Sequence, residues 1–180
     1  MRVITGKARG VVLKTPEGMQ TRPTTDRVKE ALFSIIQFDI PGCKVLDLFG
    51  GTGQLGIEAL SRGAKSAVFV DASDAACKLI RENLKRTKLE NDAKVVRSDY
   101  MEYLRRCHET FDVIFLDPPY AEVFLEKSLN CITEIDILQT NGIIVTERAL
   151  EKELSWDILG YTRSKDYKYG NTLITLYRKN

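Results

Sequence analysis

Residues 45–56 read VLDLFGGTGQLG, and this stretch decides the fold of the chain. A short apolar run ends in Asp47, is followed by a turn that contains Gly50, Gly51 and Gly53, and then opens a helix. Glycines let a backbone turn tightly and approach a ligand closely. A buried strand, a glycine-rich turn and a helix in this order are typical of α/β domains that bind a cofactor at the helix N-terminus.

From Lys44 onward, strand and helix patterns alternate. The strand patterns are short, continuous apolar runs, which suit strands that are buried on both faces of a largely parallel sheet. Helical patterns separate the runs, which predicts a three-layer α/β sandwich. Residues 161–178 lack helical periodicity and are expected to form a closing antiparallel pair that ends in a strand at 172–177. The predicted strands are 45–49, 67–70, 95–96, 113–116 and 143–145, and the predicted helices are 55–62, 74–89, 100–107 and 122–133.

The first forty residues read as an extension of this core. Residues 1–16 alternate loosely and suggest a short hairpin with Lys7 and Arg9 near its turn. A helix is expected over 25–38, where apolar residues recur on one helical face. We therefore expect one domain, with an N-terminal extension over 1–40 and a catalytic core over 41–180.

Length and composition are those of a soluble globular protein. The chain has 180 residues, of which 43% are hydrophobic and 29% charged, and it contains no apolar run of the length that a membrane-spanning helix needs. The N-terminus also lacks the apolar stretch of a secretory signal. We expect a cytoplasmic monomer with no membrane partner.

Positive charge is concentrated at the N-terminus. Residues 1–30 hold seven Lys and Arg against three acids, a net +4, whereas the rest holds 20 against 22, a net −2. A basic arm on a near-neutral domain suggests a surface that contacts phosphates. Most charge clusters are only solvated faces, so this pattern leaves both interpretations open.

Cysteine and histidine give no sign of a metal site. The four cysteines contain no Cys-x-x-Cys pair, and His108 is the only histidine. Cys77, Cys107 and Cys131 fall in predicted helices and are expected to be buried free thiols. No metal is expected.

The glycine turn alone does not identify the cofactor. Gly51, Gly53 and Gly56 spell Gly-x-Gly-x-x-Gly, with Asp71 at the end of the next strand, which also fits a dinucleotide-binding domain. Asp47 favours a different ligand, because a carboxylate just before the turn would repel a pyrophosphate. S-adenosylmethionine carries a sulfonium and an ammonium group instead, so an acid at this place helps to bind it.

Asp71 and Asp99 both follow predicted strands, at the edge where open α/β sheets bind ligands. Asp71 is expected at the ribose hydroxyls. Asp99 suits either the adenine amino group or the N-cap of the following helix, and the two uses are compatible. The residues predicted to hold S-adenosylmethionine are Asp47, Phe49, Gly50, Gly51, Gly53, Asp71 and Asp99.

The tetrad Asp117-Pro118-Pro119-Tyr120 directly follows the apolar run at 113–116. Two prolines give a rigid loop that is poor in backbone donors and presents acceptors, namely the Asp117 carboxylate and the Pro118 carbonyl. Such acceptors suit an aryl amine, since hydrogen bonds to its protons make its nitrogen a better nucleophile. Tyr120 offers a face on which an extruded base can stack. The four residues of the tetrad are the predicted catalytic residues.

These motifs resemble a known family. Residues 47–53 together with the tetrad resemble the amino-methyltransferases of class I fold, which is Rossmann-like. Three further runs make the likeness specific to the bacterial RsmD family, over nearly the whole chain: GKARG at 6–10, RPTTDRVKEALF at 22–33 and LSRGA at 60–64. Small departures are Gly51-Thr52, where the family more often has Ala-Ser, and Lys29, where Arg is common.

The resemblance implies methylation of the 2-amino group of one guanine in small-subunit (16S) ribosomal RNA, with S-adenosylmethionine as methyl donor. The guanine would stack against Tyr120, with its amino group between Asp117 and Pro118. RNA phosphates are expected at Lys7, Arg9, Arg22, Arg27 and Lys29. The alternatives are an adenine-N6 methyltransferase, an NAD-dependent oxidoreductase and a non-catalytic RNA-binding module. Protein glutamine methylation fits less well, because that group resembles Asn-Pro-Pro-Tyr.

Overall fold

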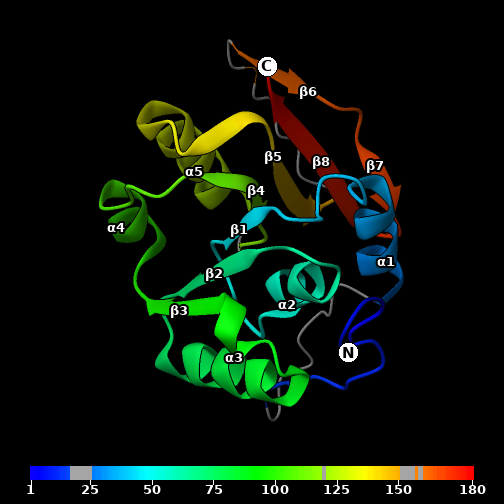
Figure 1. The fold of residues 1–180 in the computed structure, drawn as a ribbon. Helices are drawn as coiled ribbons and strands as arrows, with labels where there is room; N and C mark the ends of the chain where they lie inside the picture. The colour runs from blue at the N-terminus through cyan, green and yellow to red at the C-terminus, as the bar shows by residue number, and fades with distance from the viewer. Residues whose placement is uncertain (17–25, 119–120, 151–156, 158–159) are drawn as a thin grey trace.

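The structure is a computed structural model that describes residues 1–16, 26–118, 121–150, 157 and 160–180. Helices and strands alternate from α1 to β5, as the apolar runs indicate, and three further strands follow (Figure 1). The helices are α1 (Asp26–Ile35), α2 (Gln54–Ser61), α3 (Asp74–Thr87), the 3-10 turn η1 (Glu90–Asp92), α4 (Tyr100–Arg105) and α5 (Ala121–Ile135). The strands are β1 (Lys44–Asp47), β2 (Ser66–Asp71), β3 (Ala93–Arg97), β4 (Phe111–Leu116), β5 (Leu138–Ala149), β6 (Tyr161–Arg163), β7 (Tyr167–Tyr169) and β8 (Thr172–Lys179).

Within the described residues the strands form a single mixed sheet in the order β3-β2-β1-β4-β5-β8-β6, with β7 also paired to β8. The five strands β1 to β5 run parallel to one another, and β8 pairs antiparallel with β5. The predicted closing antiparallel pair is confirmed, and both β6 and β7 pair with β8.

Helices cover both faces of the sheet, so the predicted three-layer sandwich is confirmed. One hydrophobic cluster joins the sheet to α1, α2 and α3, and a second joins it to α4 and α5. Successive residues of β1 alternate between these clusters: Val45 packs on the first side and Leu46 on the second. This alternation explains the continuous apolar runs, because both faces of each central strand need an apolar side chain.

The N-terminal segment contributes to the first cluster through Val3, Ala8 and Leu13, which are all buried. The predicted short hairpin is present, with an antiparallel bridge from Arg2 to Val12 and a turn that has positive φ at Gly6 and Gly10. Backbone hydrogen bonds join the two sides of the hairpin, from the Val3 N–H to the Val11 carbonyl (3.0 Å) and from the Leu13 N–H to the Met1 carbonyl (3.2 Å). Side chains of α2 and α3 accept further hydrogen bonds from its backbone and hold it against the core.

Element boundaries differ from the predictions by a few residues. The strand predicted at 45–49 ends at Asp47, and the helix predicted over 25–38 ends at Ile35. Strand β5 is much longer than its apolar run, because it also includes the exposed residues 139–141 and the residues 147–149, which pair with β8. Cys107 lies beyond the end of α4 and is only partly buried, whereas Cys77 and Cys131 are buried as expected.

Among the described residues, no helix combines the length and apolar character that a membrane crossing requires. The same part of the chain brings no three His, Cys, Asp or Glu side chains together in a way that would hold a metal ion.

Candidate active site at the carboxyl edge of the sheet

Three aspartates meet where the parallel strands end. Asp47 pairs in register with Phe69 of β2 on one side and with Phe115 of β4 on the other. Asp71 and Asp117 each lie two residues beyond those partners, so they flank the end of β1 from opposite sides. The glycine turn that leaves β1 therefore lies between the predicted cofactor residue Asp71 and the predicted catalytic residue Asp117.

Glycine is required at several positions of the turn. Gly51 and Gly53 have φ values of 55° and 80°, which side chains with a Cβ rarely adopt. A Cβ at Gly50 would lie 2.8 Å from the Ile80 side chain, and one at Gly53 would lie 3.2 Å from it. A Cβ at Gly51, by contrast, would meet only the Phe49 carbonyl at 3.9 Å. Gly50 and Gly53 thus bring the turn close to α3, while the Gly51 backbone faces open space.

Asp71 holds this turn in place. Its carboxylate accepts hydrogen bonds from the Gly51 N–H (2.9 Å) and from the Ser73 N–H (2.8 Å). The Gly50 N–H donates to the Val70 carbonyl at 2.8 Å, which ties the turn to β2 a second time. A carboxylate has lone pairs for about four hydrogen bonds, so these two leave acceptor capacity for ribose hydroxyls.

Asp47 is the buried acid of the site. Its side chain is 2% exposed and accepts one hydrogen bond, from the Gly56 N–H of α2 at 3.2 Å. Burial raises the pKa of Asp47 to about 7, an effect that the Gly56 N–H opposes and the nearby Asp71 charge adds to. The close approach of α2 depends on Gly56, since a Cβ there would lie 2.3 Å from the Phe69 ring.

Asp99 and Phe49 lie at the same edge of the sheet, Asp99 after β3 and Phe49 after β1. Asp99 caps α4 by accepting from the Met101 N–H (2.9 Å) and the Glu102 N–H (3.2 Å), which confirms the capping use. Phe49 lies in an aromatic cluster with Tyr100 and Phe124, with ring centroids 5.2 to 6.3 Å apart. These rings come from the β1 turn, the start of α4 and the start of α5, so they join the predicted cofactor side to the helix that follows the tetrad.

The described part of the tetrad occupies the expected place. Asp117 follows β4 and is half-buried, and Pro118 is buried. Pro119 and Tyr120 lie outside the described residues. Asp117 and Pro118 therefore lie at the sheet edge, across the glycine turn from Asp71.

The residues at this edge fit S-adenosylmethionine. A buried carboxylate with a single hydrogen bond is electrostatically costly and is stabilised by a cation. Asp47 is in that state, and S-adenosylmethionine carries an ammonium and a sulfonium. The open approach at Gly51 and the acceptors of Asp71 match the backbone and the ribose of the same molecule.

Three of the predicted RNA-binding residues lie on the surface. Lys7, Arg9 and Arg27 are exposed, and none of them forms an ion pair with the described residues. Arg22 lies outside the described residues. Lys7 and Arg9 flank the buried Ala8, so the docked turn holds two cations outward.

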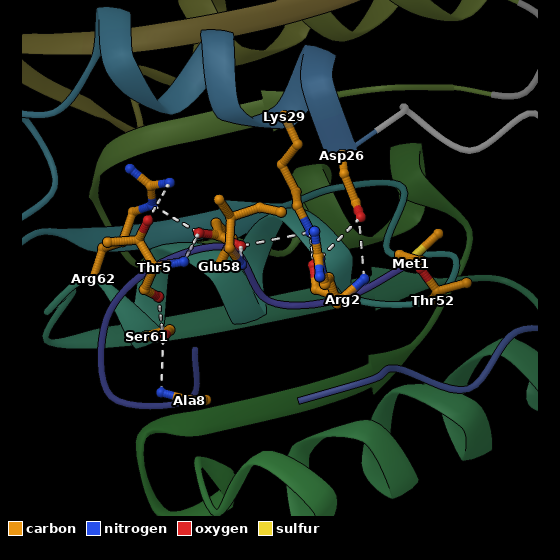
Figure 2. Close-up of polar contacts among 11 residues, drawn as sticks. Met1, Arg2, Thr5, Ala8, Asp26, Lys29, Thr52, Glu58, Ser61 and Arg62 are labelled. Carbon is orange, nitrogen blue, oxygen red and sulfur yellow. Dashed lines mark hydrogen bonds and ion pairs between the residues drawn. The ribbon is translucent and has the colours of Figure 1, made fainter. Parts of the chain in front are cut away.

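The prediction for Lys29 is wrong. Its side chain is fully buried, where its Nζ atom lies 3.5 Å from the Glu58 carboxylate and donates to the Arg2 carbonyl (Figure 2). Burial lowers the pKa of Lys29, while the charge of Glu58 opposes that shift. Lys29 is therefore a structural cation inside the protein and is not available to an RNA phosphate.

Glu58 is an organising residue that sequence reasoning missed. Its buried carboxylate accepts from the Ile4 N–H (2.8 Å), the Thr5 N–H (3.0 Å) and Arg62 Nε (2.8 Å), besides pairing with Lys29 (Figure 2). The sequence carries a signal for this role, because Glu58 is the one charged residue of α2 and lies among Leu, Ile and Ala residues. An acid in such a helix requires partners, and here they come from the N-terminal segment and from α1.

Comparisons with known proteins agree along the whole chain. The family model described as "Conserved hypothetical protein 95" matches residues 1–178. "Putative rRNA methyltransferase YlbH" of Bacillus subtilis is 42% identical over 99% of both chains. "Ribosomal RNA small subunit methyltransferase D" of Escherichia coli is 32% identical over 99% of this chain and 90% of its own. The solved structure "Putative methyltransferase yhhF from Escherichia coli" superposes with a TM-score of 0.90 at 32% identity, over 99% of this chain and 97% of the other.

Proposed function

Because this chain belongs to the family described as Conserved hypothetical protein 95, the RsmD family, we propose that it methylates the 2-amino group of a guanine in small-subunit ribosomal RNA. The methyl donor is S-adenosylmethionine. The observation that carries the proposal is the arrangement at the sheet edge, where Asp71 and Asp117 flank the glycine turn and Asp47 lies buried beneath it.

The cofactor side of the site comprises the β1 turn and three acids. Asp47 compensates the positive charge of the ligand, Asp71 accepts from the ribose hydroxyls, and Asp99 lies at the adenine end. When bound, S-adenosylmethionine supplies an electrophilic methyl group. The protein contributes mainly position, which is worth up to roughly 7–11 kcal/mol in favourable systems.

The substrate side is formed by Asp117 and Pro118. The amine of guanine has its lone pair delocalised into the ring, so it is a poor nucleophile until its protons are held by acceptors. The Asp117 carboxylate and the Pro118 carbonyl supply two such acceptors at the end of β4. The proton released after transfer leaves to Asp117 or to solvent. Tyr120 would stack on the extruded base.

The N-terminal arm (residues 1–16) and the start of α1 supply the contact with the RNA backbone. Lys7, Arg9 and Arg27 point outward without an ion-pair partner among the described residues, and Arg22 belongs to the same region of sequence. Arginine binds phosphates in a bidentate manner, so this surface fits the RNA around the target base. The substrate is the small ribosomal subunit or its RNA, and the protein acts as a monomer in the cytoplasm.

The test is a methylation assay on small subunits from cells that lack the enzyme. Purified protein and methyl-labelled S-adenosylmethionine are incubated with these subunits, and in parallel with naked small-subunit RNA. Digestion then identifies the labelled nucleoside. N2-methylguanosine at one site is the expected result, and N6-methyladenosine would instead assign the protein to the adenine-N6 enzymes. Label in neither substrate would overturn the proposal in favour of a binding module.

A further inference from the structure

Asn83 joins two parts of the molecule that are far apart in sequence. It lies in α3 and its side chain is fully buried. Its Nδ2 group donates to the Thr52 carbonyl (2.9 Å) in the glycine turn and to the Lys14 carbonyl (3.1 Å) at the end of the N-terminal arm. Its Oδ1 atom accepts from the Lys14 N–H at 2.7 Å.

These three bonds occupy both N–H groups of the amide and one acceptor position of its oxygen. Toward Lys14 the amide acts like the peptide of a neighbouring strand, because it accepts from the N–H and donates to the carbonyl of one residue. The second N–H is thereby aimed at Thr52. The reversed amide would place N–H against N–H and oxygen against oxygen, so the three bonds fix its orientation.

Further contacts hold the same two partners together. The arm runs along α3, where Lys14 pairs with Glu82 at 2.7 Å and Arg86 Nε donates to the Val12 carbonyl at 3.2 Å. Thr52 is also contacted from the arm, since its hydroxyl lies 3.4 Å from the Met1 sulfur. The position of the arm and the shape of the glycine turn are thus specified by one connected set of contacts.

We propose that Asn83 is a positioning residue that couples the binding of S-adenosylmethionine to the binding of RNA. This inference rests on the proposed function. The glycine turn approaches the cofactor through its backbone, while Lys7 and Arg9 on the arm approach the RNA. A ligand that settles the turn fixes the Thr52 carbonyl, and Asn83 passes that constraint to Lys14 and the segment beyond it. Coupling between two sites is reciprocal, so each ligand raises the affinity for the other by the same factor.

Asn83→Asp tests this role. The variant retains an acceptor for the Lys14 N–H, but it cannot donate, and it sets a carboxylate against the Thr52 and Lys14 carbonyls. Thr87→Val is the matched control, because Thr87 is buried one turn along the same helix and its hydroxyl donates only to α3 carbonyls.

The measured quantity is the ratio of two dissociation constants. Calorimetry gives the Kd of S-adenosylhomocysteine twice, once for the protein without RNA and once for the protein saturated with small subunits from cells that lack the enzyme. For the unmodified protein and Thr87→Val we expect subunits to tighten binding by about fivefold or more, within the usual range of coupling. For Asn83→Asp the ratio should fall to about 1 while both ligands still bind. A lower melting temperature alone would not change this ratio.

A ratio near 1 in the unmodified protein, or an undiminished ratio in Asn83→Asp, would overturn the inference. Failure of the unmodified protein to bind S-adenosylhomocysteine or subunits would instead count against the proposed function. If Asn83→Asp does not fold, the coupling is tested by hydrogen exchange on the unmodified protein. The Lys14 amide should exchange more slowly when S-adenosylhomocysteine binds, and an unchanged rate would refute the coupling.

Discussion

The Lys29 Nζ atom lies 3.5 Å from Glu58 Oε2, and both side chains are completely excluded from solvent. The pair joins α1 to α2, and the same carboxylate holds the backbone of Ile4 and Thr5. The buried Glu58 carboxylate therefore connects α2, the helix that follows the cofactor turn, to both α1 and the N-terminal arm.

We expect Glu58→Gln to destabilise the protein strongly, because it leaves the Lys29 ammonium buried without its anion. Breaking a buried pair by removing one partner typically costs about 3–5 kcal/mol. Urea unfolding measures the change. Glu82→Gln is the control: it removes the acid of the Lys14–Glu82 pair, whose side chains are 52% and 53% exposed. That change should cost less than about 1 kcal/mol. Equal effects would show that the buried pair does not fasten the arm.

Two glycines of the arm should respond very differently to alanine. A Cβ at Gly6 would lie 1.8 Å from the Ser61 carbonyl oxygen, whereas one at Gly10 would meet nothing within 4 Å. Both have φ above +80°, so both variants carry backbone strain of about 1–3 kcal/mol. Only Gly6→Ala should also displace the arm. Amide exchange reports this, since the Lys7 N–H bonds to Ser61 and should lose protection in Gly6→Ala alone.

Binding of S-adenosylhomocysteine should strengthen as pH rises toward neutrality. Burial raises the pKa of Asp47 from 3.8 to about 7, and the ammonium of the ligand favours the ionised carboxylate. As the pH rises toward 7, the Kd should fall by up to about tenfold for each pH unit, and above pH 7 it should level off. The stability of the ligand-free protein should change in the opposite direction. Because the folded state binds a proton that the unfolded state has released, the free energy of unfolding should decrease as the pH rises from about 4 to 7. In Asp47→Asn, the Kd of S-adenosylhomocysteine measured by calorimetry should not change between pH 5.5 and 7.5. A pH dependence that persists in this variant would show that a group other than Asp47 takes up the proton.

The cofactor edge could be predicted because its signals are local. A strand, a turn and a helix that follow one another in sequence place Asp47 and Gly51 without any knowledge of distant contacts. The strand ends then bring Asp71 and Asp117 to the same edge, since parallel strands share the orientation of their carboxyl ends.

The interior of the N-terminal region was harder to predict. Lys29 precedes Leu32 and Phe33 by three and four residues, so helical periodicity places it on the buried face, yet its charge suggested a surface role. Asn83 follows Ile80 by three residues, so periodicity places it on the buried face as well, but its partners Thr52 and Lys14 are 31 and 69 residues away. Buried polar residues acquire their function from long-range partners, which composition and periodicity do not reveal.

Binding to RNA should depend on salt through the exposed cations of the arm. Each phosphate contact contributes roughly 0.7–0.9 to the slope of log K against log salt. Replacing both Lys7 and Arg9 with Ala should therefore reduce the slope by roughly 1.4–1.8, measured by filter binding to small subunits. Lys78→Ala is the control, because Lys78 already pairs with Asp74 at 2.8 Å on α3. A slope that is unchanged in the double variant would remove the arm from the RNA interface.

Asp117 should matter for transfer and not for cofactor affinity. It lies at the carboxyl end of β4, across the glycine turn from Asp71, where the amine of the base would be held. Asp117→Asn keeps the shape but lacks the charge, and replaces one acceptor with a donor. We expect kcat to fall by about 100-fold or more, as when one preorganised polar contact to the reacting group is lost. The Kd of S-adenosylhomocysteine should change by less than about twofold, since loss of this contact spares the cofactor turn. Asp112→Asn is the control at the opposite end of the same strand, where Asp112 accepts from the Lys44 N–H at 2.7 Å. If Asp117→Asn weakens cofactor binding as much as it slows turnover, Asp117 belongs to the cofactor pocket, and the acceptor for the amine has to be sought elsewhere along this edge.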